Sequence, residues 1–414
     1  MTHRVAAIDC GTNSIRLLIA DLQPESDERT RGDTRGVRGP GGTGGGSPPC
    51  RKSVPPGEVG GAPDTMAGFA IGRASGPAPS SPPLTDVTRQ MRIVRLGEGV
   101  DRTGRLSAAA LDRTMTALRE YAELIADAKP EAVRMVATSA TRDAANSQEF
   151  TDRVVAILGV APEVITGDEE ALLSFTGATR ELAGTPVAAE CLPPYLVTDI
   201  GGGSTEFVLG GADGQGARGQ APRDRVPRGE SPRDRVPRGQ VPRDQAPRDQ
   251  VARDRVPRDQ IQGRSVNIGC VRLTERHLHG DPPSGPEIEA TVRDIDAALE
   301  VAAAAVPAEK ARTLVGLAGS VTTVAAIALG LGEYNSARIH HSRVSAARVH
   351  EIAAELLAMT RADRAAIPVM HPGRVDVIGA GALILDRIMA RFGFAEVLVS
   401  EHDILDGIAW SLVP

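Results

Sequence analysis

Three consecutive glycines, residues 201–203, lie between an aspartate and a polar run in the stretch TDIGGGSTEF (198–207). Glycine loses more backbone freedom on folding than any other residue, so a triplet soon after the strand-like residues 195–197 indicates a tight turn that must approach something closely. Backbone N–H groups in such a turn can converge on anionic oxygens, as they do in phosphate sites. A glycine-rich hairpin without a ligand has the same pattern, and this stretch alone does not separate the two interpretations.

A second stretch repeats this pattern near the N-terminus. AAIDCGTNSIRLLIAD (6–21) and LVTDIGGGSTEFVLG (196–210) both contain an apolar run, an aspartate, a glycine, two small residues, a serine and a second apolar run. Each predicts a β-hairpin, and two such hairpins would place phosphate-binding turns on both sides of a cleft between domains. A third glycine turn, VGLAGSVTT (315–323), could close that cleft. The matched positions are Asp9 with Asp199, Gly11 with Gly201, and Ser14 with Ser204.

Composition narrows the class of protein. A chain of 414 residues, 41% of them hydrophobic, can bury a sizeable core and suggests two domains. A net charge of -6 argues against sequence-specific nucleic-acid binding. The four cysteines are far apart without a CxxC pair, which indicates neither a zinc site nor a disulfide framework and suits a reducing, cytoplasmic location. The N-terminal run has no signal-peptide character, and we expect the uncharged stretch 314–332 to be a strand, a turn and a buried helix rather than a membrane span.

Two segments of low complexity interrupt the apolar pattern. Residues 22–86 are rich in Gly, Pro and Arg and lack apolar periodicity, so we expect a disordered insertion there. Residues 211–263 contain a five-residue repeat with proline in one register, which neither a helix nor a strand can use. Between positions 211 and 264 there are thirteen arginines and eight acidic residues, so this second insertion is either a neutral passenger or a weakly basic tether.

Several motifs in order along the rest of the chain resemble one family. Their pattern resembles the actin-like ATPase superfamily and, within it, the exopolyphosphatase/guanosine-pentaphosphate phosphohydrolase (Ppx/GppA) family. The motifs are DCGTNS (9–14), RLGEGVDRTGRLS (95–107), ATSATRDAANSQEF (137–150), GDEEA (167–171), DIGGGSTE (199–206) and GLAGSVTT (316–323).

The resemblance implies an α/β fold of two actin-like (ribonuclease H-like) domains, whose mixed sheets are flanked by helices and separated by a cleft. We expect the domains at residues 1–172 and 173–414. The chain stops soon after VSEHDILDGIAW (399–410), so it is similar to a short, two-domain form of the family. A homodimer is left open.

The GDEEA motif has two interpretations. From the residues alone, Asp168 suits a helix N-cap, and Glu169 and Glu170 suit the positive end of the helix. The resemblance implies instead that Glu170 is the general base that activates water, for which burial would have to raise its pKa. Glu206 is expected to help orient that water.

The other implied roles concern charge around a phosphate. Carboxylates repel phosphate, so Asp9, Asp199 and Glu206 need a divalent cation, Mg²⁺ or Mn²⁺, between them and the substrate; hairpin-end turn acids are the alternative for any one of them.

Asn146 would lock the loop that carries Arg142. His340 and His341 are interpreted as loop residues rather than a metal site. The expected phosphate-binding residues are Thr12, Asn13, Ser14, Arg142, Gly202, Gly203, Ser204 and Thr205.

These roles imply a hydrolase that removes the terminal phosphate of inorganic polyphosphate, with no membrane partner. Hydrolysis of guanosine pentaphosphate at its 5′-γ-phosphate is the alternative within the family, and nothing in the residues selects between the two. An actin-like ATPase or kinase, or a non-catalytic sensor of alarmone nucleotides, is a further alternative. Intact Glu170 and Glu206 argue against the sensor.

Overall fold

The computed structural model describes residues 2–23, 84–182, 185, 187, 190–211 and 261–412. Most of the two expected insertions, 22–86 and 211–263, lies outside the described residues. At their edges, residues 22, 84–86, 262 and 263 belong to strands, because the chain enters and leaves each segment through paired strands.

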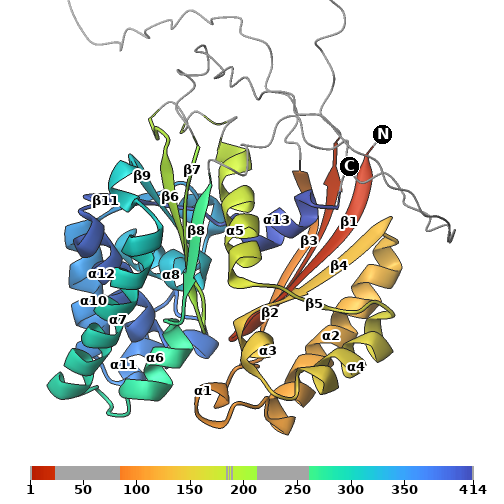
Figure 1. Ribbon diagram of the computed structural model, residues 1–414, viewed down its shortest axis with the longest axis horizontal. Coiled ribbons are helices and arrows are strands. Elements are labelled where there is room, and N and C mark those ends of the chain that lie inside the picture. The colour runs from red at the N-terminus through yellow and green to blue at the C-terminus, as the bar shows by residue number, and fades with distance from the viewer. Residues whose placement is uncertain are drawn as a thin grey trace, which may run out of the picture. The chain divides into compact units, whose positions relative to one another are not determined.

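The first of two sheets has five strands in the order β3-β2-β1-β4-β5 (Figure 1). Strands β1 and β2 form an antiparallel hairpin, β3 pairs antiparallel with β2, and β4 pairs parallel with β1. The strands are β1 (His3–Cys10), β2 (Ser14–Leu22), β3 (Leu84–Ile93), β4 (Ala132–Ala137) and β5 (Glu163–Val164). This sheet and the helices that follow its strands are called the first lobe. Its helices are α1 (Val100–Thr103), α2 (Ala108–Ala128), α3 (Ser139–Asp143) and α4 (Ser147–Leu158).

The second sheet has six strands in the order β10-β11-β9-β6-β7-β8. Here β6 and β7 form the antiparallel hairpin, β8 extends it, and β9 pairs parallel with β6. Its strands are β6 (Tyr195–Ile200), β7 (Thr205–Gly210), β8 (Gln262–Val266), β9 (Thr313–Leu317), β10 (Arg343–Ser345) and β11 (Glu396–Val399). The helices are α5 (Gly167–Leu182), α6 (Cys270–His277), α7 (Gly285–Ala305), α8 (Ala318–Ala328), α9 (Ser336–Ile339), α10 (Ala346–Ala358), α11 (Arg361–Ala365), α12 (Ile378–Phe392) and α13 (Ile404–Trp410), with 3₁₀ turns at Ala308–Lys310 and Pro372–Arg374.

The two sheets repeat one plan, as the duplicated motifs predicted. Each contains a hairpin, an outer antiparallel strand and a parallel partner: β3-β2-β1-β4 in one and β8-β7-β6-β9 in the other. Both mixed sheets are flanked by helices, so the predicted fold class is confirmed. Within 314–332 the expected strand and buried helix are β9 and α8, but α8 begins directly after β9, so the residues expected to form a turn, Gly319 and Ser320, belong to the start of the helix. None of the described helices is long and apolar enough to cross a membrane.

Helices α5 and α13 lie between the two sheets (Figure 1). Apolar residues of α13, including Ile404 and Ile408, pack against Val5 and Ala7 of β1, while Phe175 of α5 packs against β6 and β7 residues. The expected domain boundary at 172/173 falls inside α5, and the C-terminal α13 returns to the first sheet. The lobes are therefore joined by two helices rather than by a linker.

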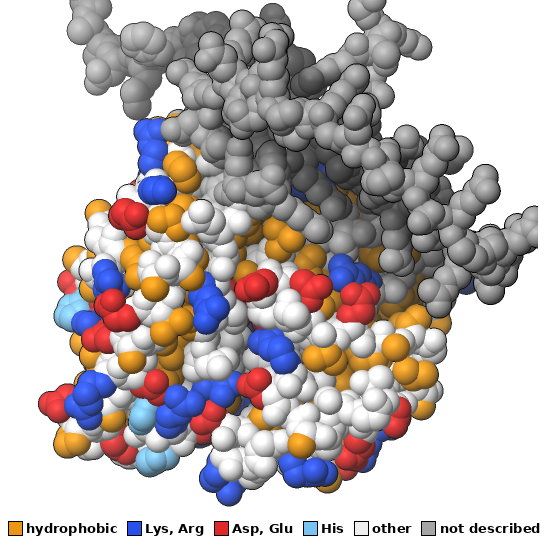
Figure 2. Space-filling view, viewed as in Figure 1, with side chains coloured by type: hydrophobic (Ala, Val, Ile, Leu, Met, Phe, Trp, Pro, Cys, Tyr) orange, Lys and Arg blue, Asp and Glu red, His pale blue; other side chains and the backbone are white. Residues whose placement is uncertain are grey.

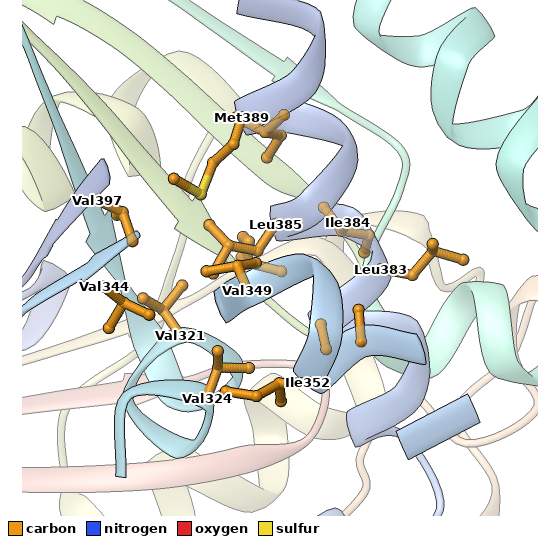
Figure 3. Close-up of a cluster of buried hydrophobic side chains, with 14 of the residues drawn as sticks. Val321, Val324, Val344, Val349, Ile352, Leu383, Ile384, Leu385, Met389 and Val397 are labelled. Atoms are coloured by element: carbon orange, nitrogen blue, oxygen red, sulfur yellow. The ribbon is translucent and has the colours of Figure 1, made fainter. Parts of the chain in front are cut away.

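The larger core fills the second lobe. Leu383, Ile384 and Met389 of α12 meet Val349 and residues of α8, β10 and β11 in one apolar cluster (Figure 3). A separate cluster joins β1 and β2 to α2 and α4 in the first lobe. Strands covered on both faces must be apolar throughout, which explains the nearly unbroken apolar runs before Asp9 and Asp199. Those two aspartates stand at the ends of the runs, where the strands leave the core.

Candidate active site

The two hairpin turns close in the same way and face each other. The Gly11 N–H donates to the Ser14 carbonyl (2.9 Å), and the Gly201 N–H donates to the Ser204 carbonyl (3.0 Å). A Cβ added to Gly202 would lie 3.0 Å from Thr12 Cβ, a contact tighter than side chains normally make. The lack of a side chain at Gly202 therefore allows the two turns to lie close to each other, whether or not they also bind a ligand.

A cleft opens beside these turns, and most of the expected site residues line it. It also has lining residues from β3, α3, α6, α8 and α12, which brings the segment expected to form the third glycine turn to the same place. The expected site residues on its walls are Asp9, Thr12, Asn13, Ser14, Glu170, Asp199, Gly202 and Ser204.

Glu170 lies in the first turn of α5 with its carboxyl group in the cleft. It is 8% exposed, and burial raises its pKa to about 8. Arg142 Nη1 donates to Glu170 Oε2 (3.2 Å) and to the Ile165 carbonyl (2.8 Å), and its positive charge opposes part of this rise. The neighbouring Glu169 instead accepts from the Thr166 N–H (2.9 Å), as a helix-start residue does. Of the two glutamates, the structure thus places Glu170 where a base could act.

Glu206 lies near Glu170 but is more deeply buried. It is 1% exposed on β7 and accepts a hydrogen bond from the Ser265 hydroxyl (2.7 Å). Burial, followed by the negative charge of Glu170, raises the pKa of Glu206. A negative charge on Glu170 therefore disfavours ionisation of Glu206.

The remaining two carboxylates face a basic residue. Arg16 donates to Asp9 Oδ2 through Nε (3.0 Å) and Nη2 (2.6 Å), and also pairs with Asp403. Asp199 Oδ2 accepts from the Ser174 hydroxyl (2.7 Å), and burial raises the pKa of Asp199 to about 6. Burial also raises the pKa of Asp9, although Arg16 opposes the rise. Arg16 therefore supplies positive charge where the sequence led us to expect a metal ion alone.

The carboxylates of the cleft wall supply only some of the ligands that a divalent cation needs. Within the described ranges, no group of three or more His, Cys, Asp or Glu side chains has metal-ligand geometry, so Asp9, Asp199 and Glu206 do not form a closed site. Asp9 Oδ1, however, is buried without a hydrogen-bond partner. Mg²⁺ is commonly held by one or two carboxylates together with substrate phosphates, and Asp9 and Asp199 on the cleft wall suit that arrangement.

Three of the expected phosphate ligands lie away from the cleft wall. Thr205 is fully buried, and its hydroxyl donates to the Ile268 carbonyl (2.7 Å), so its proton is committed to the fold. Gly203 packs against Thr12 and Ser139 rather than opening to the cleft. Arg142 contacts Glu170, and its contact with a phosphate stays a prediction.

Two further expectations concern loops. Asn146 accepts from the Leu106 N–H (2.8 Å) and donates to the Leu106 carbonyl (3.1 Å), so it ties α4 to the loop before α2. His340 and His341 stack with ring centroids 3.7 Å apart, His340 also contacts His402, and no metal cluster forms there among the described residues.

The sequence analysis did not predict Arg16 as a site residue, although the comparison of the two hairpins could have indicated it. In the first hairpin Asp9 pairs with Arg16, and in the second Asp199 pairs with Glu206, so the duplicated motif has an arginine and a glutamate at matching positions. Arg16 is a charged residue within the apolar run from Ile15 to Ala20, and this interruption marks the position in the sequence. Ser139 and Arg374, also on the cleft wall, and Ser174 and Ser265, which hold the carboxylates, had no comparable signal.

Two lobes with matching hairpins, facing turns and connecting helices define the actin-like class of two-domain proteins. Solved structures of this class share the fold: the Ppx/GppA enzyme of Aquifex aeolicus (TM-score 0.61, 24% identity, 99% of this chain and 100% of that one) and an exopolyphosphatase from Cytophaga hutchinsonii (TM-score 0.63, 19% identity, 99% and 97%). The chain belongs to the Ppx/GppA phosphatase family, whose model matches residues 76–217 and 257–414.

Individual relatives differ in how much of their length matches. Exopolyphosphatase 2 of Mycobacterium tuberculosis is 41% identical over 99% of this chain and 98% of its own. A guanosine-5'-triphosphate,3'-diphosphate pyrophosphatase of Aeromonas hydrophila is 25% identical over 80% of this chain but only 55% of its own. The crystal structure of an exopolyphosphatase-like protein matches with a TM-score of 0.70 at 35% identity, covering 98% of both chains.

Proposed function

We propose that this protein is an exopolyphosphatase that hydrolyses the terminal phosphoanhydride bond of inorganic polyphosphate. The observation that carries the proposal is Glu170, a buried carboxylate with a pKa of about 8, in the same cleft as two facing glycine turns. The full-length similarity to a protein named exopolyphosphatase supports polyphosphate as the substrate.

In this proposal Glu170 is the general base. Its raised pKa makes the carboxylate a better proton acceptor, so it can take a proton from a water molecule as the water attacks the terminal phosphorus. The bond from that phosphorus to the bridging oxygen breaks, which releases inorganic phosphate and a polyphosphate shorter by one unit. The turns around Thr12 and Gly202 hold the terminal oxygens, and Arg142 orients Glu170. Glu206, held by Ser265, keeps a second carboxyl group near the water.

Asp9 and Asp199 would hold a Mg²⁺ or Mn²⁺ ion together with substrate oxygens. Such an ion supplies charge neutralisation, so that carboxylates and phosphates can occupy one cleft. Arg16 contributes positive charge to the same wall and limits the repulsion between Asp9 and a phosphate. Glu206 as a third ligand, a homodimer and the cytoplasmic location stay predictions.

Guanosine pentaphosphate is the second candidate substrate because it presents the same terminal phosphoanhydride. The guanosine-5'-triphosphate,3'-diphosphate pyrophosphatase of Aeromonas hydrophila matches over 55% of its own length, whereas the exopolyphosphatase of Mycobacterium tuberculosis matches over 98%. An actin-like ATPase would act on ATP, whose terminal bond is also of this type. The three substrates therefore need to be compared directly.

The test is phosphate release from polyphosphates of defined length, from guanosine pentaphosphate and from ATP, each with and without Mg²⁺. We expect the largest kcat/KM with polyphosphate and a strong dependence on the metal. Faster turnover of guanosine pentaphosphate would make that nucleotide the substrate, and turnover of ATP alone would identify an ATPase.

A further inference from the structure

Arg272 on α6 links the glycine turn of the second lobe to the first lobe. Its Nε donates to the Gly203 carbonyl (2.7 Å). The other two nitrogens of the guanidinium reach across to the first lobe, with Nη1 on Asp101 (2.5 Å) and Nη2 on Asp143 (2.6 Å). One planar group thus contacts the turn and two separate elements of the opposite lobe.

The rest of α6 is arranged to hold this turn. The backbone N–H of Cys270 donates to the Gly201 carbonyl (3.0 Å), and that of Val271 to the Gly202 carbonyl (2.9 Å). A Cβ at Gly269 would overlap the Gly202 carbonyl group, so the helix start lies directly against the turn. Movement of α6 therefore moves the glycine turn with it.

The proposed chemistry assigns no role to either of the two first-lobe partners of Arg272. Asp101 lies in RLGEGVDRTGRLS, and Asp143 follows Arg142 at the end of α3. The same surface carries further links: Arg276 donates to Asp101 (2.9 Å), and Glu275 accepts from the Gly99 N–H (3.1 Å). Figure 2 shows basic and acidic side chains close together where α6 and α1 lie in Figure 1.

Arg272 is better placed than its neighbours to act on the site. Its side chain is 12% exposed, against 33% for Arg276, so its ion pairs are less screened by water and salt. A guanidinium can serve three acceptors in one plane, whereas an ammonium group presents a single charged point. Charge-assisted hydrogen bonds of this kind also fix orientation.

We propose that Arg272 is a positioning residue: by binding Asp101 and Asp143 it sets the glycine turn 201–204 against the turn around Thr12 and completes the phosphate cradle when the lobes are closed. This proposal rests on the proposed function. It assigns closure to ion pairs between α6 and two first-lobe segments, distinct from the α5 and α13 connection. Arg272 is the member of this charged surface that also contacts the glycine turn, so it couples the ion pairs between the lobes to the cradle.

The experiment compares Arg272→Ala, Arg272→Lys and Asp143→Asn with a matched control, Asp294→Asn. Asp294 pairs with Arg276 and His277 within the second lobe, so its substitution changes the same charged surface without a link across the lobes. The measurements are kcat and KM for polyphosphate of defined length, the thermal midpoint, and the radius of gyration by X-ray scattering without substrate.

We expect Arg272→Ala to lower kcat/KM by about 10- to 100-fold, because a small displacement of a binding turn weakens positioning of the reacting phosphate. Its radius of gyration should rise, its thermal midpoint should change little, and Arg272→Lys should restore only part of the rate. Asp143→Asn should lose a smaller factor that shrinks with added salt, because salt weakens the same ion pair in the wild type, while Asp294→Asn behaves as wild type. Wild-type rates and wild-type scattering in Arg272→Ala would overturn the proposal, as would full rescue by lysine.

If Arg272→Ala does not fold, Asp101→Asn combined with Asp143→Asn tests the same link, because Arg272 keeps its contact with Gly203. An unchanged rate and unchanged scattering in that double variant would overturn the proposal. If wild-type protein releases no phosphate from polyphosphate, the proposed function fails. The scattering comparison then still decides whether Arg272 closes the lobes.

Discussion

Glu170 and Glu169 are adjacent in sequence but do different things in the structure, and that difference can be measured. Gln at position 170 keeps the shape of the side chain but cannot accept a proton from water, so Glu170→Gln should lower kcat by on the order of 10²–10⁴. Substrate binding with Mg²⁺ should persist, because the glycine turns are unchanged. Phosphate release and equilibrium binding of polyphosphate are the two measurements.

Glu169→Gln is the internal control for that substitution. Glu169 caps the start of α5 through Thr166, so its loss should cost only about 0.3–1 kcal/mol of stability and leave turnover unchanged. Exchanged outcomes would mean that Glu169 is the base. Full activity in both variants would leave Glu206 as the next candidate.

Arg142 should set the pH at which the base becomes active. A base works when deprotonated, so kcat/KM should rise with pH through the pKa of Glu170, about 8. The charge of Arg142 lowers that pKa against the effect of burial, so Arg142→Ala should move the midpoint of the pH profile to higher pH, while Arg142→Lys moves it less. The profile is measured at constant Mg²⁺. A midpoint that moves to lower pH would contradict the Glu170 assignment.

At the scale of elements, the lobes meet where α5 crosses α13. A Cβ on Gly407 would overlap the Leu173 backbone, and one on Gly177 would overlap the Asp403 carbonyl, so the two helices touch through their backbones. Gly407→Ala should therefore destabilise the protein by about 1–3 kcal/mol through overpacking. Urea denaturation measures the loss.

Gly285→Ala is the matched control, because a Cβ there has no neighbour within 4 Å. It should leave the urea midpoint unchanged or raise it, since alanine reduces the freedom of the unfolded chain. Equal losses of stability in the two variants would show that Gly407→Ala does not act through the contact between α5 and α13.

Sequence pattern was sufficient to predict both hairpins and the strand and helix within 314–332, because each depends on neighbouring residues. The motif resemblance singled out Glu170 as the general base, and the structure places this residue on the cleft wall, while its role stays a prediction. Contacts between distant segments were not predictable in this way. Thr205 has the right residue type for a phosphate site, but its hydroxyl is bound to Ile268, 63 positions along the chain. The contacts of Arg272 with Asp101 and Asp143 likewise depend on how the two lobes meet.

At the scale of the whole molecule, both expected insertions begin and end at paired strands. Leu209 of β7 pairs with Gln262 of β8, and Leu22 of β2 pairs with Leu84 of β3. The chain ends on either side of each segment are therefore adjacent, at roughly the 5 Å separation of neighbouring strands. A hairpin loop of about two to five residues spans that separation.

Replacing residues 212–260 with a short Gly-Ser turn should consequently leave β7 and β8 paired, and the folded protein and its turnover of short polyphosphate intact. The deleted sequence contains twelve arginines and eight acidic residues, so a basic tether is the one function its composition suggests. If it binds polyphosphate, the deletion should weaken affinity for long chains only, and high salt should remove the difference. A neutral linker of equal length in place of the segment separates the effect of charge from that of length. Loss of folded, soluble protein on deletion would show instead that residues 212–260 are part of the fold.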